Sequence, residues 1–302
     1  MTAVCDTIPE KANELAALYN AKAYYSIEDL LANEMGVDVA IICTPNGLHA
    51  QHSIKFLGAA VNVLCEKPLC IHVEDGEKMI AAAAKNNKKL FVVKQNRYNP
   101  PVAFLKELIV SGKLGKIFSF QINCFWNRPD AYYTDWKGKK ELDGGTLYTQ
   151  FSHFIDLLYW LLGDVATIKT ITKNFIHKAI DFEDTGVVLF EMKNGAIGTM
   201  NYTVNSFNKN MEGSFAVFAE NGTVKVGGQY LNELEYFNVA GAATPELPKG
   251  NTANEYGFYQ GSMSNHDKVY ENLLIALQNP QHQFANAMEG LKTVAIIGQI
   301  YQ

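Results

Sequence analysis

Short apolar runs alternate with helical stretches over the first third of the chain. Five runs read as strands, because each is apolar or β-branched and is closed by polar or turn-forming residues. They cover residues 2–5, 21–25, 37–43, 61–65 and 90–93. Between them, the apolar spacing over 9–19 and 73–86 is helical, and Ser26 caps another short helix. This alternation predicts a doubly wound, parallel α/β sheet with helices on both faces.

The remaining two thirds follow a different pattern, and Pro100-Pro101 marks the junction. We therefore expect a first domain over 1–99 and a second over 100–302. Strand-like runs cover 117–125, 166–173, 185–192, 196–204, 214–219 and 223–226, and helical spacing covers 101–111, 147–162, 265–277 and 286–301. This predicts an α+β domain with an open, largely antiparallel sheet covered by helices on one face. The segment 240–259, rich in Gly, Pro and Asn, reads as a long loop.

Composition places the chain among ordinary globular proteins. It has 302 residues, 48% of them hydrophobic, and a net charge of −5, which suits two domains and argues against a nucleic-acid partner. No apolar run reaches the length of a membrane span, and the first residues do not resemble a signal peptide. The five cysteines are scattered without a C-x-x-C pair, so we expect a cytoplasmic protein without a metal site. Cys43, Cys65 and Cys124 lie in strand-like runs and are expected to be buried.

The apolar run over 61–65 ends in Glu66-Lys67-Pro68, which puts Lys67 just past the carboxyl end of a predicted strand. In open α/β sheets ligands bind at that edge. Partial burial there can lower the pKa of a lysine enough for proton transfer. Taken alone, a surface lysine at a strand end is the commoner explanation. The rest of the chain favours a functional one.

Asp6 follows the first predicted strand and leads into a helix. At that position a dinucleotide-binding fold hydrogen-bonds the adenosine ribose, while helix capping is the alternative. No arginine follows directly, which favours NAD over NADP. No G-x-G-x-x-G loop precedes Asp6, so we expect a sheet without its first strand and glycine loop. The chain then reads as a fragment, or as one whose start was assigned about 25–30 residues late.

Two segments of the second domain carry further candidate chemistry. Residues 126–138 are rich in aromatic and polar side chains, which suits a sugar ring or a nicotinamide; packing or an oligomer contact is an equally good explanation. On the helix predicted over 147–162, Thr149, His153 and Asp156 share one face. For His153 alone, a core histidine is the more frequent explanation.

Together these residues resemble the Gfo/Idh/MocA family of NAD(P)-dependent oxidoreductases over essentially the whole chain. The motifs that carry the resemblance are Cys43-Thr44-Pro45-Asn46 with His49, Glu66-Lys67-Pro68-Leu69, Asn96-Arg97-Tyr98, Gly144-Gly145, and His153 with Asp156. Within the family, residues 209–214 and 222–228, with Leu231-Asn232, look like the UDP-N-acetylglucosaminuronate 3-dehydrogenases. Those enzymes oxidise the sugar 3-hydroxyl during synthesis of bacterial surface polysaccharides.

The resemblance implies a Rossmann-like first domain and a role for each matching residue. Lys67 hydrogen-bonds the reacting hydroxyl and helps to move its proton, and His153 is the general base. The implied NAD-binding residues are Asp6, Thr44, Pro45, Asn46, His49, Glu66, Lys67, Asn96 and Trp136, and the implied substrate-binding residues are Arg128, Tyr148, Thr149 and Asn232. Many family members have an aspartate where this chain has Thr149, so we expect a less polarised imidazole. The Lys67–Pro68 peptide bond is expected to be cis.

The expected activity is therefore hydride transfer from a sugar hydroxyl carbon, the C3 of a UDP-N-acetyl-hexosaminuronate, to NAD. Three alternatives remain: a dehydrogenase of another sugar or cyclitol, a non-catalytic sugar- or nucleotide-binding module, and NAD-dependent cleavage of glycosides without net oxidation. A homodimer or homotetramer is expected through the sheet of the second domain, because a sheet with one uncovered face commonly pairs with a copy of itself. A solvated polar face is the alternative.

Overall fold

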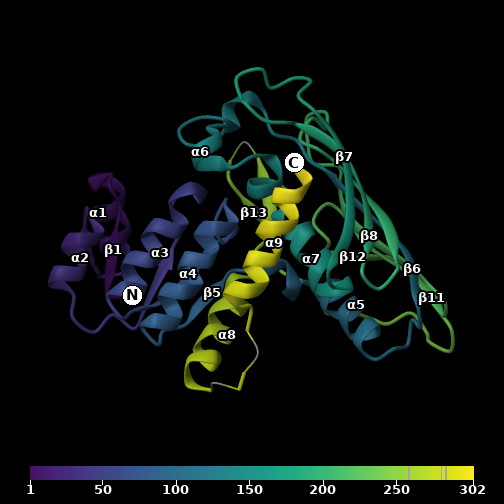
Figure 1. Ribbon diagram of the computed structural model, residues 1–302, viewed down its shortest axis with the longest axis horizontal. Helices are drawn as coiled ribbons and strands as arrows, with labels where there is room; N and C mark the ends of the chain where they lie inside the picture. The colour runs from purple at the N-terminus through teal and green to yellow at the C-terminus, as the bar shows by residue number, and fades with distance from the viewer. Residues whose placement is uncertain (258, 280, 283) are drawn as a thin grey trace.

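The computed structural model describes residues 1–257, 259–279, 281–282 and 284–302. Figure 1 shows an α/β half on one side and a large curved sheet on the other. Helices α7 (Ser152–Leu162) and α9 (Ala287–Ile300) lie between them. The site described below forms where these layers meet.

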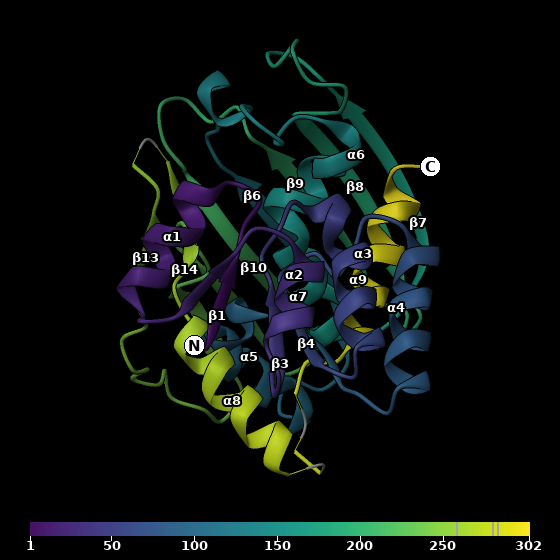
Figure 2. The same cartoon turned by 90° about the vertical axis from the view of Figure 1, so that its left-hand side faces the viewer.

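The first half alternates strand and helix as predicted. Its elements are β1 (Ala3–Cys5), α1 (Pro9–Leu18), β2 (Lys22–Tyr24), α2 (Ile27–Asn33), β3 (Val39–Ile42), α3 (His49–Gly58), β4 (Asn62–Cys65), α4 (Val73–Lys85) and β5 (Leu90–Val92). The backbone N–H of Asp29 donates to Ser26 Oγ at 3.1 Å, so Ser26 caps α2 as expected. All strand pairs are parallel, and Figure 2 shows α1 to α4 in front of the large sheet.

The parallel strands form two groups, β1-β2 and β3-β4-β5. Within the described residues no ladder joins β1 to β3, which agrees with the expectation of a sheet without its first strand. β4 is the most deeply buried strand, since Val63, Leu64 and Cys65 have no exposed surface. An apolar run of this kind is covered on both faces, and the residues that follow it lie at the edge of the sheet.

The second half contains a seven-stranded sheet in the order β12-β11-β10-β6-β9-β8-β7. Its strands are β6 (Ile117–Phe125), β7 (Val165–Lys173), β8 (Thr185–Met192), β9 (Ile197–Thr203), β10 (Glu212–Ala219), β11 (Gly222–Gly227) and β12 (Glu233–Val239). Only the pair β6–β9 is parallel among these described strands. Helices α5 (Pro100–Val110), α7 and α9 cover one face, and no described helix covers the other (Figure 1). The predicted open, largely antiparallel sheet is confirmed.

The structure differs from the sequence-based predictions in three segments. The strand β12 was not predicted, because its charged and polar positions at the sheet edge hide the apolar alternation. The supposed loop over 240–259 contains β13 (Ala253–Glu255), which pairs with β14 (Gln260–Met263), and its residue 258 lies outside the described residues. The single helix predicted over 147–162 is a π-helical turn, η4 (Leu147–Phe151), followed by α7. The expected domain boundary at 99–100 stays a prediction.

The end of the second half returns to the first. The backbone N–H of Val92 donates to the Ala285 carbonyl at 3.1 Å, which extends the parallel sheet at β5. Helix α8 (His266–Gln278) packs Val269 and Leu273 against Leu64 and Phe91 of that sheet. Within the described ranges, no helix combines the length and apolar character that crossing a bilayer requires.

Candidate active site

The loops after β3 and β4 are locked together by one buried histidine. His49 Nδ1 lies 2.7 Å from the Pro68 carbonyl, and its Nε2 lies 2.8 Å from the Thr44 carbonyl. The Lys67–Pro68 peptide bond is cis, as expected. His49 thereby fixes the predicted Thr44-Pro45 turn beside the loop that carries Lys67. Of these residues, Thr44, Pro45, His49 and Lys67 are predicted to bind the cofactor.

Lys67 reaches across to the second half of the molecule. Its Nζ donates to the carbonyl oxygen of Thr149 at 2.7 Å. Thr149 belongs to η4, and His153 lies four residues further on the same helical segment, so the two share a face. The two residues predicted to be catalytic therefore meet on one side of the molecule, although they come from different halves.

His153 is a buried imidazole, with 6% of its surface exposed. Neither of its ring nitrogens has a hydrogen-bond partner among the residues that the structure describes. Burial lowers the pKa of His153 well below its usual value, and the nearby charges of Lys67 and Lys94 lower it further. The imidazole is thus neutral at pH 7, with both ring nitrogens unpaired among the described residues.

Both negatively and positively charged side chains surround the ammonium of Lys67. Burial lowers its pKa to about 8, while the carboxylates of Glu66 and Asp143 oppose that change and Arg128 and Lys94 reinforce it. Lys67 is therefore still protonated at pH 7 but titrates far closer to neutrality than an exposed lysine. Such a group can donate a hydrogen bond to a developing alkoxide.

Asp143, at the end of α6 (Lys140–Asp143), is a buried carboxylate that the sequence reasoning missed. The hydroxyl of Thr149 donates to it, and Asn46 Nδ2 donates to Thr149 Oγ1 and to the Asp143 carbonyl, each at 2.8 Å. The only signal in the sequence was an acidic residue directly before Gly144-Gly145. This cluster connects the loop after β3 to the helical turn η4, in which the Thr149 carbonyl accepts from Lys67.

Arg128 is a buried cation, with 2% of its surface exposed. Its Nε donates to Gln150 Oε1 at 2.7 Å, and its Nη1 donates to the Asn127 carbonyl at 2.6 Å and to Asn210 Oδ1 at 3.2 Å. Its guanidinium carbon lies near the rings of three aromatic side chains: Trp126 at 5.1 Å, Tyr132 at 5.4 Å and Tyr259 at 4.9 Å. In the described part of the chain, no carboxylate forms an ion pair with Arg128, and its Nη2 has no hydrogen-bond partner.

The structure places three predicted site residues elsewhere. The ring of Tyr148 packs on Tyr301 of the last turn, with centroids 5.9 Å apart. Asn232 Oδ1 accepts from the Tyr230 backbone N–H at 3.1 Å in the turn before β12. Trp136 lies in the loop before α6, where Lys137 Nζ is 5.3 Å from its ring. No hydrogen bond, ion pair or ring contact among the described residues joins these three to Lys67 or His153, and their site roles stay predictions.

The loops of the first half have free groups that fit a dinucleotide. Asn96 Oδ1 and Gln95 Oε1, in η2 (Gln95–Tyr98) after β5, are buried and unpaired within the described residues. Asp6 uses Oδ1 to accept from the Ile8 N–H at 2.8 Å, and its Oδ2 has no described partner. Glu66 pairs with His266, at the start of α8, at 2.9 Å. Unpaired acceptors at the carboxyl ends of parallel strands are where such a fold holds its ribose and nicotinamide.

Two family models match the chain. One, described as an oxidoreductase family with an NAD-binding Rossmann fold, matches residues 1–94; the other, described as the GFO/IDH/MocA C-terminal domain, matches residues 102–225.

Solved structures of similar chains carry nucleotide-sugar ligands. The WlbA dehydrogenase from Bordetella pertussis, in complex with NADH and UDP-GlcNAcA, is 34% identical with a TM-score of 0.88, and the match covers 100% of this chain and 87% of that one. The WlbA dehydrogenase from Chromobacterium violaceum, with the same two ligands, is 32% identical with a TM-score of 0.88, covering 99% and 84%.

Curated relatives are more distant. Levoglucosan dehydrogenase from Pseudarthrobacter phenanthrenivorans is 24% identical over 257 residues, which are 77% of this chain and 66% of that protein. The chain spans about half to two thirds of the first of these curated relatives.

Proposed function

Because the chain belongs to the Gfo/Idh/MocA family of oxidoreductases with an NAD-binding Rossmann fold, we propose that it oxidises a ring hydroxyl of an acidic nucleotide sugar. The proposed reaction takes the C3 hydroxyl of a UDP-N-acetyl-hexosaminuronate to a ketone and reduces NAD. The observation that carries the redox assignment is the Lys67 ammonium on the Thr149 carbonyl, beside the uncharged and unpaired His153 imidazole.

Residues from both halves of the molecule take part in the proposed reaction. NAD, when bound, supplies the hydride acceptor. The Lys67 ammonium donates a hydrogen bond to the reacting oxygen and stabilises the negative charge that develops there. The neutral His153 accepts the hydroxyl proton. The carbinol carbon thus loses a hydride, the oxygen loses a proton, and the products are a ketone, NADH and one released proton.

Arg128 supports an acidic substrate. A buried cation without a counter-ion is costly, because its desolvation is not offset by an opposite charge. Arg128 still has Nη2 unpaired within the described residues and is held by Gln150, the residue directly after Thr149. A carboxylate or phosphate of the substrate supplies the missing charge and accepts a charge-assisted hydrogen bond from Nη2. The UDP-GlcNAcA complexes of the two WlbA dehydrogenases support the same substrate class.

The direct test is NADH formation by the full chain with a panel of alcohols. UDP-N-acetylglucosaminuronate is expected to give a kcat/KM at least about 10²-fold above that of UDP-N-acetylglucosamine, which lacks the carboxylate. Equal values would refute the acidic substrate. Levoglucosan and inositols test the second candidate, oxidation of a neutral sugar or cyclitol, which the levoglucosan relative favours. A chain that oxidises none of these compounds is not the proposed dehydrogenase.

Removing the charge of Arg128 tests the substrate contact. Arg128→Gln is expected to raise the KM for the uronate by about 10²-fold, because a buried charge pair is lost. Arg128→Lys keeps the charge without the planar fork and should lose less. Lys137→Gln is the matched control, since Lys137 lies over Tyr132 in the same aromatic region, and its KM is expected to stay within a few fold. An unchanged KM in Arg128→Gln removes Arg128 from the substrate site.

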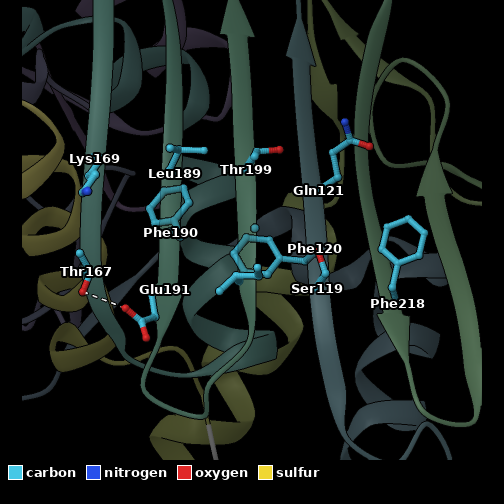
Figure 3. Close-up of a pocket in the computed structure, with 12 residues that line it drawn as sticks. Ser119, Phe120, Gln121, Thr167, Lys169, Leu189, Phe190, Glu191, Thr199 and Phe218 are labelled. Atoms are coloured by element: carbon cyan, nitrogen blue, oxygen red, sulfur yellow. Dashed lines mark hydrogen bonds between the residues drawn. The ribbon is translucent and has the colours of Figure 1, made fainter.

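The uncovered face of the large sheet supports a homo-oligomer. Its exposed side chains include Ile197, 59% exposed, and Leu189, 51% exposed. Figure 3 shows Leu189, Thr199, Gln121 and Phe218 on the neighbouring strands β8, β9, β6 and β10, around a hollow of about 510 Å³. We propose that a second copy of the chain covers this face, giving a homodimer or a homotetramer built from two such dimers.

A charge placed on this face should separate the copies. Leu189→Glu is expected to shift the molar mass measured by light scattering from that of the oligomer to that of one chain, because it buries an unpaired carboxylate at the contact. Val110→Glu is the control, since Val110 is exposed on α5, away from this face. A wild-type chain that is monomeric at all concentrations contradicts the proposal.

The pathway role follows from the product. A 3-keto nucleotide sugar is a substrate for an aminotransferase, so we place the reaction in the cytoplasmic synthesis of a bacterial surface polysaccharide. Mass spectrometry of the product should show the loss of two hydrogens and, after an aminotransferase is added, an amine at C3. Activity found only outside the cytoplasmic fraction would contradict this location.

A further inference from the structure

Asp143 is a carboxylate between the two halves that no part of the proposed reaction uses. It is 1% exposed. Its Oδ2 accepts from the Gly138 N–H at 2.9 Å, and its Oδ1 accepts from the Gly145 N–H at 3.4 Å and from the Thr149 hydroxyl. A buried carboxylate with this many donors is held in one orientation.

Thr149 connects this carboxylate to the amine of Lys67. Its hydroxyl donates to Asp143, and its carbonyl accepts from Lys67 Nζ at 2.7 Å. Asn46, in the loop after β3, donates from its Nδ2 to Thr149 Oγ1 and to the Asp143 carbonyl, each at 2.8 Å. The π-helical geometry of η4 departs from the ideal α-helical path at this point, a feature frequent at functional sites. The carbonyl that orients Lys67 therefore depends on the hydroxyl that Asp143 anchors.

The charged and titratable groups around Lys67 come from its own loop and from five other parts of the chain. They are Glu66 in its own loop, His49 on α3, Lys94 after β5, Arg128 after β6, Asp143 on α6 and His153 on α7. Glu66 is already paired with His266. Arg128 and Lys94 are cations and His153 is neutral, so the described carboxylates that favour a protonated Lys67 are Glu66 and, to a smaller extent, Asp143.

We propose that Asp143 is a positioning residue for Lys67: through Thr149 it fixes the carbonyl that orients the amine, and its charge keeps that amine protonated while the hydroxyl is oxidised. The inference rests on the role proposed for Lys67 in the reaction. It has two separable consequences, one for the geometry of the amine and one for its titration.

The titration is tested by the pH profile of kcat. In the wild-type enzyme kcat is expected to fall as the pH rises through about 8, because Lys67 loses its proton. Asp143→Asn removes a carboxylate and is expected to move this basic limb down by about one pH unit. An unchanged limb overturns the electrostatic part of the proposal.

The geometry is tested at Thr149, which leaves the Gly138 and Gly145 contacts of Asp143 intact. Thr149→Val keeps the shape and removes the hydroxyl, and it is expected to lower kcat by about 10-fold or more with KM within a few fold. Thr149→Ser keeps the hydroxyl and is the conservative comparison, expected to restore most of the kcat that Thr149→Val loses. Equal kcat in the two variants overturns the geometric part. This pair also keeps the proposal testable if Asp143→Asn does not fold.

A readout without turnover separates this inference from the proposed function. Lys67 is only partly exposed but remains accessible at the site, so its acetylation by trace acetic anhydride at a series of pH values, followed by mass spectrometry, reports its protonation. The midpoint is expected to be lower in Asp143→Asn than in the wild type. A shifted midpoint in a chain that oxidises no sugar supports the Asp143–Lys67 coupling and removes the dehydrogenase function. If the wild-type chain oxidises the sugar but the wild type and Asp143→Asn have the same midpoint, the dehydrogenase function is supported and the Asp143–Lys67 coupling is refuted.

Discussion

Replacing Lys67 by methionine is expected to lower the turnover number on the order of 10³-fold while the affinity for NAD stays within a few fold. Methionine keeps most of the volume beside Thr149 but removes the ammonium that donates to its carbonyl. The reacting oxygen then develops its charge without a hydrogen-bond donor from this side. Steady-state NADH formation measures the first quantity, and calorimetry with NAD measures the second.

Lys89→Met is the matched control for this variant. Lys89 precedes β5 at the opposite end of the same sheet, and its Nζ donates to the Ala276 carbonyl at 2.5 Å. Losing a lysine there should leave turnover nearly unchanged. If Lys67→Met retained turnover within about tenfold of the wild type, Lys67 would have no part in the chemical step.

The second large effect is expected in stability. Asp156→Asn should lower the free energy of unfolding by about 3–5 kcal/mol, because it leaves buried cations without their counter-ion. Asp156 accepts from Lys94 Nζ at 2.9 Å and from two nitrogens of Arg97 at 2.8 Å each, and Arg97 also reaches Glu289 at 3.1 Å. Although burial raises the pKa of Asp156, Arg97 and Lys94 hold it well below the usual value. Urea-induced unfolding measures the change.

An exposed ion pair gives the comparison for Asp156. Asp164 accepts from Lys292 at 2.7 Å, and both side chains are about 40% exposed. Asp164→Asn is therefore expected to change the free energy of unfolding by at most about 1 kcal/mol. Similar losses in the two variants would show that the buried network contributes no more than a surface pair.

The strands could be predicted where their surroundings are uniform. β4 and β5 are apolar where they are buried in the parallel sheet, and β8 alternates strictly because only one of its faces is covered. β3 is equally apolar although Ile41 is 46% exposed. β12 escaped prediction because it is an edge strand whose charged positions Glu233 and Glu235 face solvent. The β13–β14 hairpin escaped because its composition is that of a loop, and only pairing across the turn makes it a strand pair.

Site residues that belong to a short sequence motif could be predicted. Lys67 and His153 lie together because one follows a strand and the other lies on a helix that faces that strand end. His266 could not be found, since it acts through Glu66, which is remote in the sequence. Asp143 was missed although the partners of its carboxylate lie within six residues, because a single acidic residue before Gly144-Gly145 forms no motif. The π-helical turn was also hidden, because one extra residue in a helix barely changes its apolar spacing.

The return of the chain to β5 limits how the molecule can be recombined. A chimaera that contains only residues 1–99 of this chain would lose the packing of Val269 and Leu273 on Leu64 and Phe91. It would also lose the hydrogen bond from the Val92 N–H to the Ala285 carbonyl. Grafts and split reporters built on this scaffold therefore need α8 and the segment that follows it on the same side of the cut as the parallel strands.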